Sequence, residues 1–113
     1  MEKMILVAAA AGGLACVVAM AAGGGTGTIA EVHMGPHYGS KVFVRLAGSV
    51  SGQPACQTNS TCNIAFDPNT TIGKSALATI LLAKAMNAGV TYGGADQCTL
   101  LFNIEDLSWI TLN

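Results

Sequence analysis

The feature that most constrains this chain is the apolar run from Met4 to Ala22, which follows a single cation, Lys3. A short charged start, an apolar middle and a small-residue exit are the parts of a secretory signal peptide. The exit here is the tripeptide Ala-Met-Ala at 19–21, followed by a Gly- and Thr-rich stretch that ends at Ala30. We therefore expect residues 1–30 to be a signal peptide or N-terminal anchor, and the protein to be secreted or periplasmic.

A transmembrane anchor is the alternative interpretation of the same run, because about 18 apolar residues can span a bilayer. The run is rich in Ala and Gly, Gly12 and Gly13 interrupt it, and no cluster of Lys or Arg follows it, which favours cleavage. Lipid attachment at Cys16 is a third interpretation, which the residues before that cysteine do not favour. A membrane is an expected partner only if this segment is retained.

Removal of the leader would leave about 83 residues (113 − 30), which is one small domain. A chain of that size buries only roughly 60% of the surface that it exposes when unfolded, so a covalent cross-link is expected. Cys56, Cys62 and Cys98 remain to form one. Acidic and basic residues nearly balance and aromatic residues are few, which argues against nucleic acid as a partner.

Residues 31–40 combine Gly, Pro and two histidines without an apolar period, which indicates a flexible arm. The remaining residues, 41–113, are expected to form a single small α+β domain. Alternating and β-branched segments predict strands in this domain, with a loop between the first two. The predicted strands are 41–47, 62–66, 90–92, 97–103 and 107–112.

One helix is predicted from about Thr71 to Asn87, because the Asp, Asn and Thr side chains at 67–71 can cap its first amides. Gly89 is the expected left-handed stop. With connections this short, a small curled antiparallel sheet packed on this helix is the expected architecture, preceded by the signal helix. The residues expected to face the sheet are Ile72, Ala76, Leu77, Ile80, Leu81 and Ala83.

The apolar surface of the helix extends beyond that stripe to Ala78, Leu82, Ala85 and Met86. An exposed apolar strip of this kind usually marks an interface. These four residues are therefore a candidate interface in a homo-oligomer. The alternative is that the N-terminal arm or a loop of the same chain covers them.

From Lys41 to Asn113, several features follow in a fixed order: a strand, a cysteine before an Asn-containing turn, a helix, a Val-led strand and a second cysteine. This order resembles small secreted bacterial proteins and the B subunits of bacterial AB5 toxins, in particular the subtilase-cytotoxin and pertussis-like group. The resemblance implies an OB-like barrel of about five strands, association in rings and binding of glycans.

Cysteines at strand ends of a small exported domain normally form disulfides. The resemblance favours a bond between Cys62 and Cys98, which would enclose the helix and leave Cys56 over. A local bond between Cys56 and Cys62 is the competing arrangement.

Candidate chemistry beyond the cysteines is sparse. Glu105 and Asp106 are neighbours between two predicted strands, so a turn explains them better than an acid–base pair. If cleavage follows Ala30, the new terminus Glu31-Val32-His33 would offer an amine, two amides and an imidazole to copper(II) or nickel(II). No other cofactor is expected.

These observations together favour an exported, disulfide-stabilised binding or interaction module that is not an enzyme. Its partner would be a glycan or another protein, and a ring-forming, glycan-binding subunit is the more specific form of the hypothesis. The alternative is a structural or assembly component of the cell envelope, held there by its N-terminal hydrophobic segment.

Overall fold

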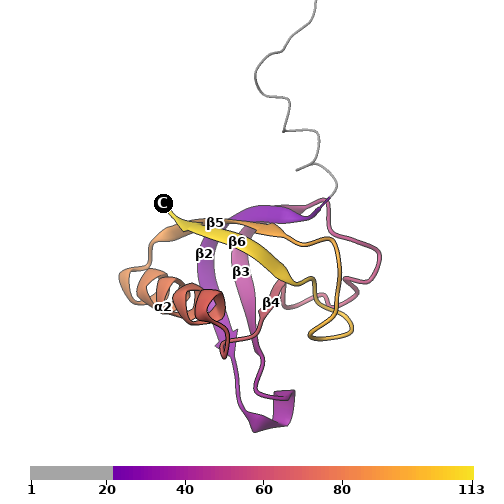
Figure 1. Ribbon diagram of the computed structural model, residues 1–113. Coiled ribbons are helices and arrows are strands. Elements are labelled where there is room, and N and C mark those ends of the chain that lie inside the picture. Colours follow the sequence, from indigo (N-terminus) through magenta and orange to yellow (C-terminus); the bar gives the residue numbers. More distant parts are fainter. Residues whose placement is uncertain (1–21) are drawn as a thin grey trace, which may run out of the picture.

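The computed structural model describes residues 22–113, which form a five-stranded antiparallel sheet packed with one α-helix (Figure 1). This architecture confirms the predicted α+β class, whereas the predicted signal helix lies outside the described residues. The elements in chain order are β2 (Gly24–His33), the 3-10 turn η2 (Pro36–Tyr38), β3 (Val42–Ser51), β4 (Ile64–Phe66), α2 (Thr71–Met86), β5 (Gly89–Gly94) and β6 (Leu107–Leu112).

The strands lie in the order β4-β3-β2-β5-β6, so the first described strand is the centre of the sheet. The two outer strands also approach each other, because Ala65 in β4 forms a parallel bridge with Asp106, the residue before β6. The Ala65 amide donates to the Glu105 carbonyl at 3.0 Å. The sheet therefore bends until its two edges meet at this point.

The central position of β2 corrects the prediction that 23–30 is only the exit of a leader. At two glycines the backbones of β2 and β3 approach so closely that no side chain fits: a Cβ on Gly27 would lie 2.3 Å from the Ala47 carbonyl oxygen, and one on Gly48 would lie 2.1 Å from that of Thr26. Close approach and sharp bending are what glycines in strands permit. The glycines in 23–30 made this segment resemble a loop in the sequence, but the strand needs glycine where the two backbones approach closely.

The predicted flexible arm at 31–40 is wrong for its first three residues, which end β2 and pair with β3. The rest is a compact connection that projects away from the sheet in Figure 1. The His33 ring stacks on Phe43 at a centroid distance of 4.9 Å, and Tyr38 meets the same ring edge-on at 4.6 Å. Aromatic contacts therefore fasten the connection to the base of β3.

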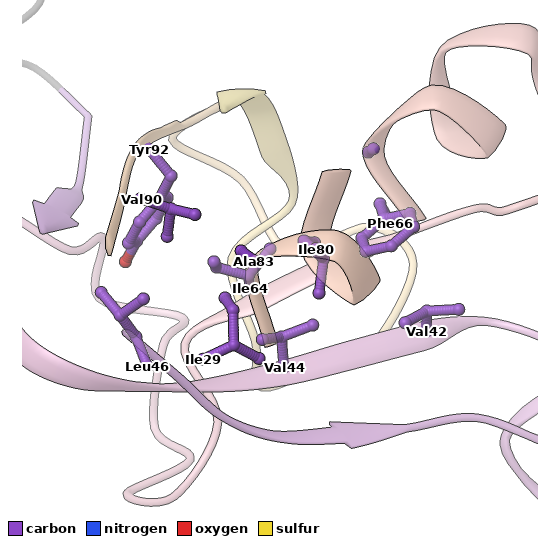
Figure 2. Close-up of a cluster of buried hydrophobic side chains, with 11 residues drawn as sticks. Ile29, Val42, Val44, Leu46, Ile64, Phe66, Ile80, Ala83, Val90 and Tyr92 are labelled. Atoms are coloured by element: carbon purple, nitrogen blue, oxygen red, sulfur yellow. The ribbon is translucent and has the colours of Figure 1, made fainter. Parts of the chain in front are cut away.

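The core lies between the inner face of the sheet and α2 (Figure 2). Alternate residues of each strand point inward, as a pleated strand requires. On β3, for example, Val42, Val44 and Leu46 are all buried. The other buried members are Ile29, Ile64, Phe66, Ala76, Ile80, Ala83, Val90 and Tyr92.

The helix begins as predicted, at Thr71, but its left-handed stop is a different residue. The Thr70 hydroxyl caps it by accepting from the Gly73 amide at 2.8 Å. Asn87, with φ 52°, is the left-handed residue at its end, and Gly89 instead begins β5.

The face of the helix that meets the sheet is also narrower than predicted, because it consists of Gly73, Ala76, Ile80 and Ala83. Ile80 is the large, fully buried side chain among them, and Leu77 is partly buried and packs against the same core. Ile72, by contrast, is turned outward and is 74% exposed, and Leu81 is exposed as well. The prediction that these two residues face the core is wrong.

Candidate binding groove

The disulfide joins Cys56 to Cys98, with Cα atoms 6.1 Å apart. The predicted bond between Cys62 and Cys98 and the local alternative are both wrong. Cys62 is a free, buried thiol that packs with Ala65 and Ile104. Burial raises the pKa of the Cys62 thiol, so it behaves as a small apolar side chain.

Residues 97–103, predicted as a strand, form a loop with an isolated bridge between Leu101 and Ile104. The cause is the buried Asp106 carboxylate, which accepts from the amides of Thr99 at 3.0 Å and Leu100 at 3.2 Å. Its other oxygen accepts from the Thr99 hydroxyl. Amides bound to a side chain are not free to join a strand ladder.

Gln57, the residue after the disulfide cysteine Cys56, also holds this loop in place. Its side-chain oxygen accepts from the Glu105 amide at 2.6 Å, and its nitrogen donates to the Cys62 carbonyl at 2.8 Å. The disulfide and this amide therefore hold the loop before β6 in a defined place. That loop forms one wall of a groove.

The groove has a volume of about 540 Å³ and runs between the first half of α2, the start of β6 and the loop before it. Volumes of this size are typical of small-molecule sites. Phe66 and Ala76 are the buried apolar part of its lining. The other residues around it include Thr70, Ile72, Ser75, Thr79, Gln97, Thr99, Leu107, Ser108 and Trp109.

Trp109 is the aromatic platform of the groove. Its indole lies against Gly93, its partner in β5, where a Cβ would come within 2.1 Å of the indole nitrogen. Since Gly93 offers no side chain, the ring can rest on the strand. The residue nevertheless remains 51% exposed, and it is among the residues that line the groove.

The polar groups around this platform are mostly neutral: hydroxyls of Thr and Ser and the amide of Gln97. Among the described residues that line the groove there is no Lys, Arg or His. Two carboxylates belong to the lining: Thr99 and Leu100 engage both oxygens of Asp106, and Asp67 accepts from the Asn69 amide. The groove therefore suits an uncharged ligand with both apolar and hydroxyl-bearing surfaces.

The predicted metal-binding terminus Glu31-Val32-His33 lies inside β2, with all three residues paired to β3. The Glu31 carboxylate accepts from Arg45 at 3.1 Å and contacts His33 at 2.9 Å. The bond to Arg45, followed by that to His33, lowers the pKa of Glu31. The site depends on cleavage after Ala30 and stays a prediction; in the structure a strand occupies these residues, and no cluster of three or more metal-ligating residues occurs within 22–113.

The predicted interface residues Ala78, Leu82, Ala85 and Met86 are all exposed on α2. They lie on the helix outside the groove lining, whereas Ile72 belongs to the groove. Sequence reasoning did not identify the groove itself. The sequence feature that could have pointed to the groove is the single tryptophan of the chain, which lies in the strand after the one that ends in Gly93-Gly94.

Comparisons with known proteins give no match to a family model, to a curated protein or to a solved structure. None of the helical segments in 22–113 has the length and apolarity needed to cross a membrane.

Proposed function

We propose that this protein is a non-enzymatic binding module whose groove between α2 and β6 holds a neutral sugar. The observation that carries the proposal is the exposed Trp109, whose indole is backed by Gly93, in a groove lining that also offers hydroxyl and amide groups. The disulfide between Cys56 and Cys98 supports export to an oxidising compartment, where such ligands are encountered.

A pyranose ring fits this chemistry because it has an apolar face of C–H groups and a rim of hydroxyls. The apolar face can pack on an indole, and the hydroxyls can exchange hydrogen bonds with Ser108, Thr79 or Gln97. The lining offers no cation to neutralise a carboxylate or a phosphate. Neutral hexoses are therefore favoured over sialic acid or sugar phosphates.

The fold supports the same function. The strand order, the helix between β4 and β5, and the parallel bridge from Ala65 to Asp106 are the features expected of an OB-like barrel. Barrels of this class bind oligosaccharides in several settings. Because the sequence resembles AB5 toxin B subunits, we extend the proposal to assembly in rings.

Binding without catalysis is proposed because both carboxylates that line the groove, Asp67 and Asp106, already accept hydrogen bonds from the chain. Asp106 accepts from the Thr99 hydroxyl and from the amides of Thr99 and Leu100, which holds the loop, and Asp67 accepts from the Asn69 amide at 2.9 Å. The groove side chains are suited to orienting a ligand rather than to transferring protons.

A glycan array tests the proposal directly, with Trp109→Ala as the disabling variant. Phe102→Ala is the matched control, because Phe102 is 85% exposed and lies outside the groove lining. The wild type and the control should bind the same neutral glycans, and Trp109→Ala should lose at least tenfold in affinity. Equal binding by all three proteins, or binding restricted to anionic glycans, would refute the groove as the site.

Self-association through α2 is a second candidate, supported by the exposed apolar strip of Ala78, Leu82, Ala85 and Met86. Leu82→Glu places a charge on this strip and leaves the buried face of the helix intact. Light scattering should then report an oligomer for the wild type and a smaller species for the variant. A wild type that is monomeric at high concentration excludes the ring.

A further inference from the structure

Glu105 is only 1% exposed, and its buried carboxylate lies next to Gly23, the second residue that the structure describes. One of its oxygens, Oε2, accepts from the Gly23 amide at 3.1 Å and from the Asp96 amide at 2.8 Å. The other, Oε1, is buried without a hydrogen-bond partner. Half of this carboxylate is therefore unsatisfied.

Two glycines make room for this carboxylate. A Cβ on Gly23 would lie 2.3 Å from Oε1, and a Cβ on Gly94 would lie 2.1 Å from the carboxyl carbon. The carboxylate is thus held between the residue that precedes β2 and the last residue of β5. The unpaired oxygen lies at the beginning of the central strand.

The charge of Glu105 has no cationic partner in the described part of the chain, where the recorded ion pairs belong to Glu31. Burying a carboxylate with neutral donors alone is unfavourable, and a nearby cation compensates for the lost hydration. The side-chain nitrogen of Gln53, also buried and unpaired next to Gly23, can supply only a neutral donor.

We propose that proteolytic processing between Ala21 and Ala22 creates the missing cation, and that the new α-ammonium of Ala22 pairs with Glu105. Hydrolysis of that peptide bond adds one water and leaves a carboxylate on Ala21 and an ammonium on Ala22. The residues at 19–21, Ala-Met-Ala, have the small-x-small pattern of a leader cleavage site. The Ala22 nitrogen is one residue from the Gly23 amide, which already contacts the carboxylate.

The ion pair between the Ala22 ammonium and Glu105 would make the stability of the folded domain depend on cleavage at this one position. A cut after Ala30 would remove most of β2 and with it the amide of Gly23. A chain left uncut would keep a neutral amide at Ala22, one residue before the amide that contacts the carboxylate. Only a cut at the start of β2 preserves the strand and supplies the charge.

The test begins with the full chain, exported from a bacterial host and purified in its processed form. Intact mass should show Ala22 as the first residue. The α-amine is then acetylated at mildly acidic pH, where lysines react little. Thermal unfolding before and after acetylation is compared in the wild type, in Glu105→Gln and in the matched control Glu31→Gln. Acetylation removes the charge without removing a residue.

Acetylation should lower the melting temperature of the wild type and of Glu31→Gln by roughly 5–10 °C, and that of Glu105→Gln by less than about 2 °C. Equal losses in all three proteins would overturn the pairing, as would a mature chain that starts at Met1 or beyond Gly23. If Glu105→Gln does not fold, the wild-type Ala22 amine is titrated by NMR. Its midpoint should exceed the ordinary range of about 7.7–8.0, and a value within or below that range overturns the proposal.

Discussion

The indole of Trp109 rests on Gly93, the residue with which it pairs across β5 and β6. This contact fixes the aromatic platform of the groove from behind, while part of the residue stays exposed. The orientation of the platform is therefore set by a residue that does not itself line the groove.

Gly93→Ala should displace this platform without altering any groove-lining side chain. The added methyl would lie 2.1 Å from the indole nitrogen, so the ring must move. We expect a shifted tryptophan emission maximum, a loss of about 1–3 kcal/mol of stability and weaker sugar binding. Because the chain has a single tryptophan, fluorescence reports on this ring alone. An unchanged spectrum would show that the contact does not hold the ring.

The bend of the sheet should depend on Gly48. A Cβ there would come within 2.1 Å of a backbone carbonyl oxygen of β2, which has little freedom to move. Gly48→Ala should therefore cost more than about 2 kcal/mol in urea unfolding. Gly89→Ala is the control, since its Cβ would meet Asn113 at an ordinary 3.5 Å. Equal midpoints for the two variants would contradict the close approach of β2 and β3.

Loss of the disulfide should be the more costly of two cysteine changes. The bond between Cys56 and Cys98 closes a loop with a sequence separation of 42, for which chain entropy gives about 4 kcal/mol. Cys56→Ala should lose up to that amount, while Cys62→Ala should lose only about 1 kcal/mol of packing. Thermal unfolding without reductant compares them, and thiol counting should find one free thiol in the processed wild type. A larger loss for Cys62→Ala would contradict this pairing.

Alkaline pH should weaken the fold through Tyr92. Burial, with a further contribution from Glu105, raises the pKa of Tyr92 to about 12 from an ordinary value of about 10. Since the folded value is the higher one, its contribution to stability is complete below pH 10 and is lost as the pH rises toward 12.

Urea unfolding at pH 8 and pH 11 measures this effect in Tyr92→Phe and in the exposed control Tyr38→Phe. The loss between the two pH values should be smaller for Tyr92→Phe than for the control. At pH 8, Tyr92→Phe should be neutral or slightly stabilising, because the Tyr92 hydroxyl is buried without a partner. Identical pH dependence of the two variants would exclude Tyr92 as the cause.

The local pattern of apolar residues was sufficient to predict the elements in which buried and exposed side chains alternate or recur with the helical period. The helix at 71–86 and the strands β3 and β6 follow their predictions within a few residues, because burial on one face dictates the period. The strand β2 was missed because close backbone approach requires glycines, and glycines read as a loop.

The other wrong predictions concern features that depend on contacts outside the local sequence pattern. The false strand at 97–103 was a reasonable local prediction, but Asp106 captures the amides of Thr99 and Leu100. The disulfide was assigned to Cys62, but Cys98 is bonded to Cys56, and Cys62 is buried as a free thiol. The groove depends on how the loop before β6 lies against α2, which no local pattern describes.

The most direct test of the account is a fluorescence titration of the processed protein with the neutral glycan that ranks first on the array. Binding should change the emission of Trp109 saturably, and the sialylated form of the same glycan should compete at least tenfold more weakly. Thr79→Val, a change at the groove that leaves the indole in place, should weaken binding without altering the spectrum of the free protein. A glycan that binds with no change in Trp109 emission and with equal affinity for Thr79→Val would contradict the assignment of this groove.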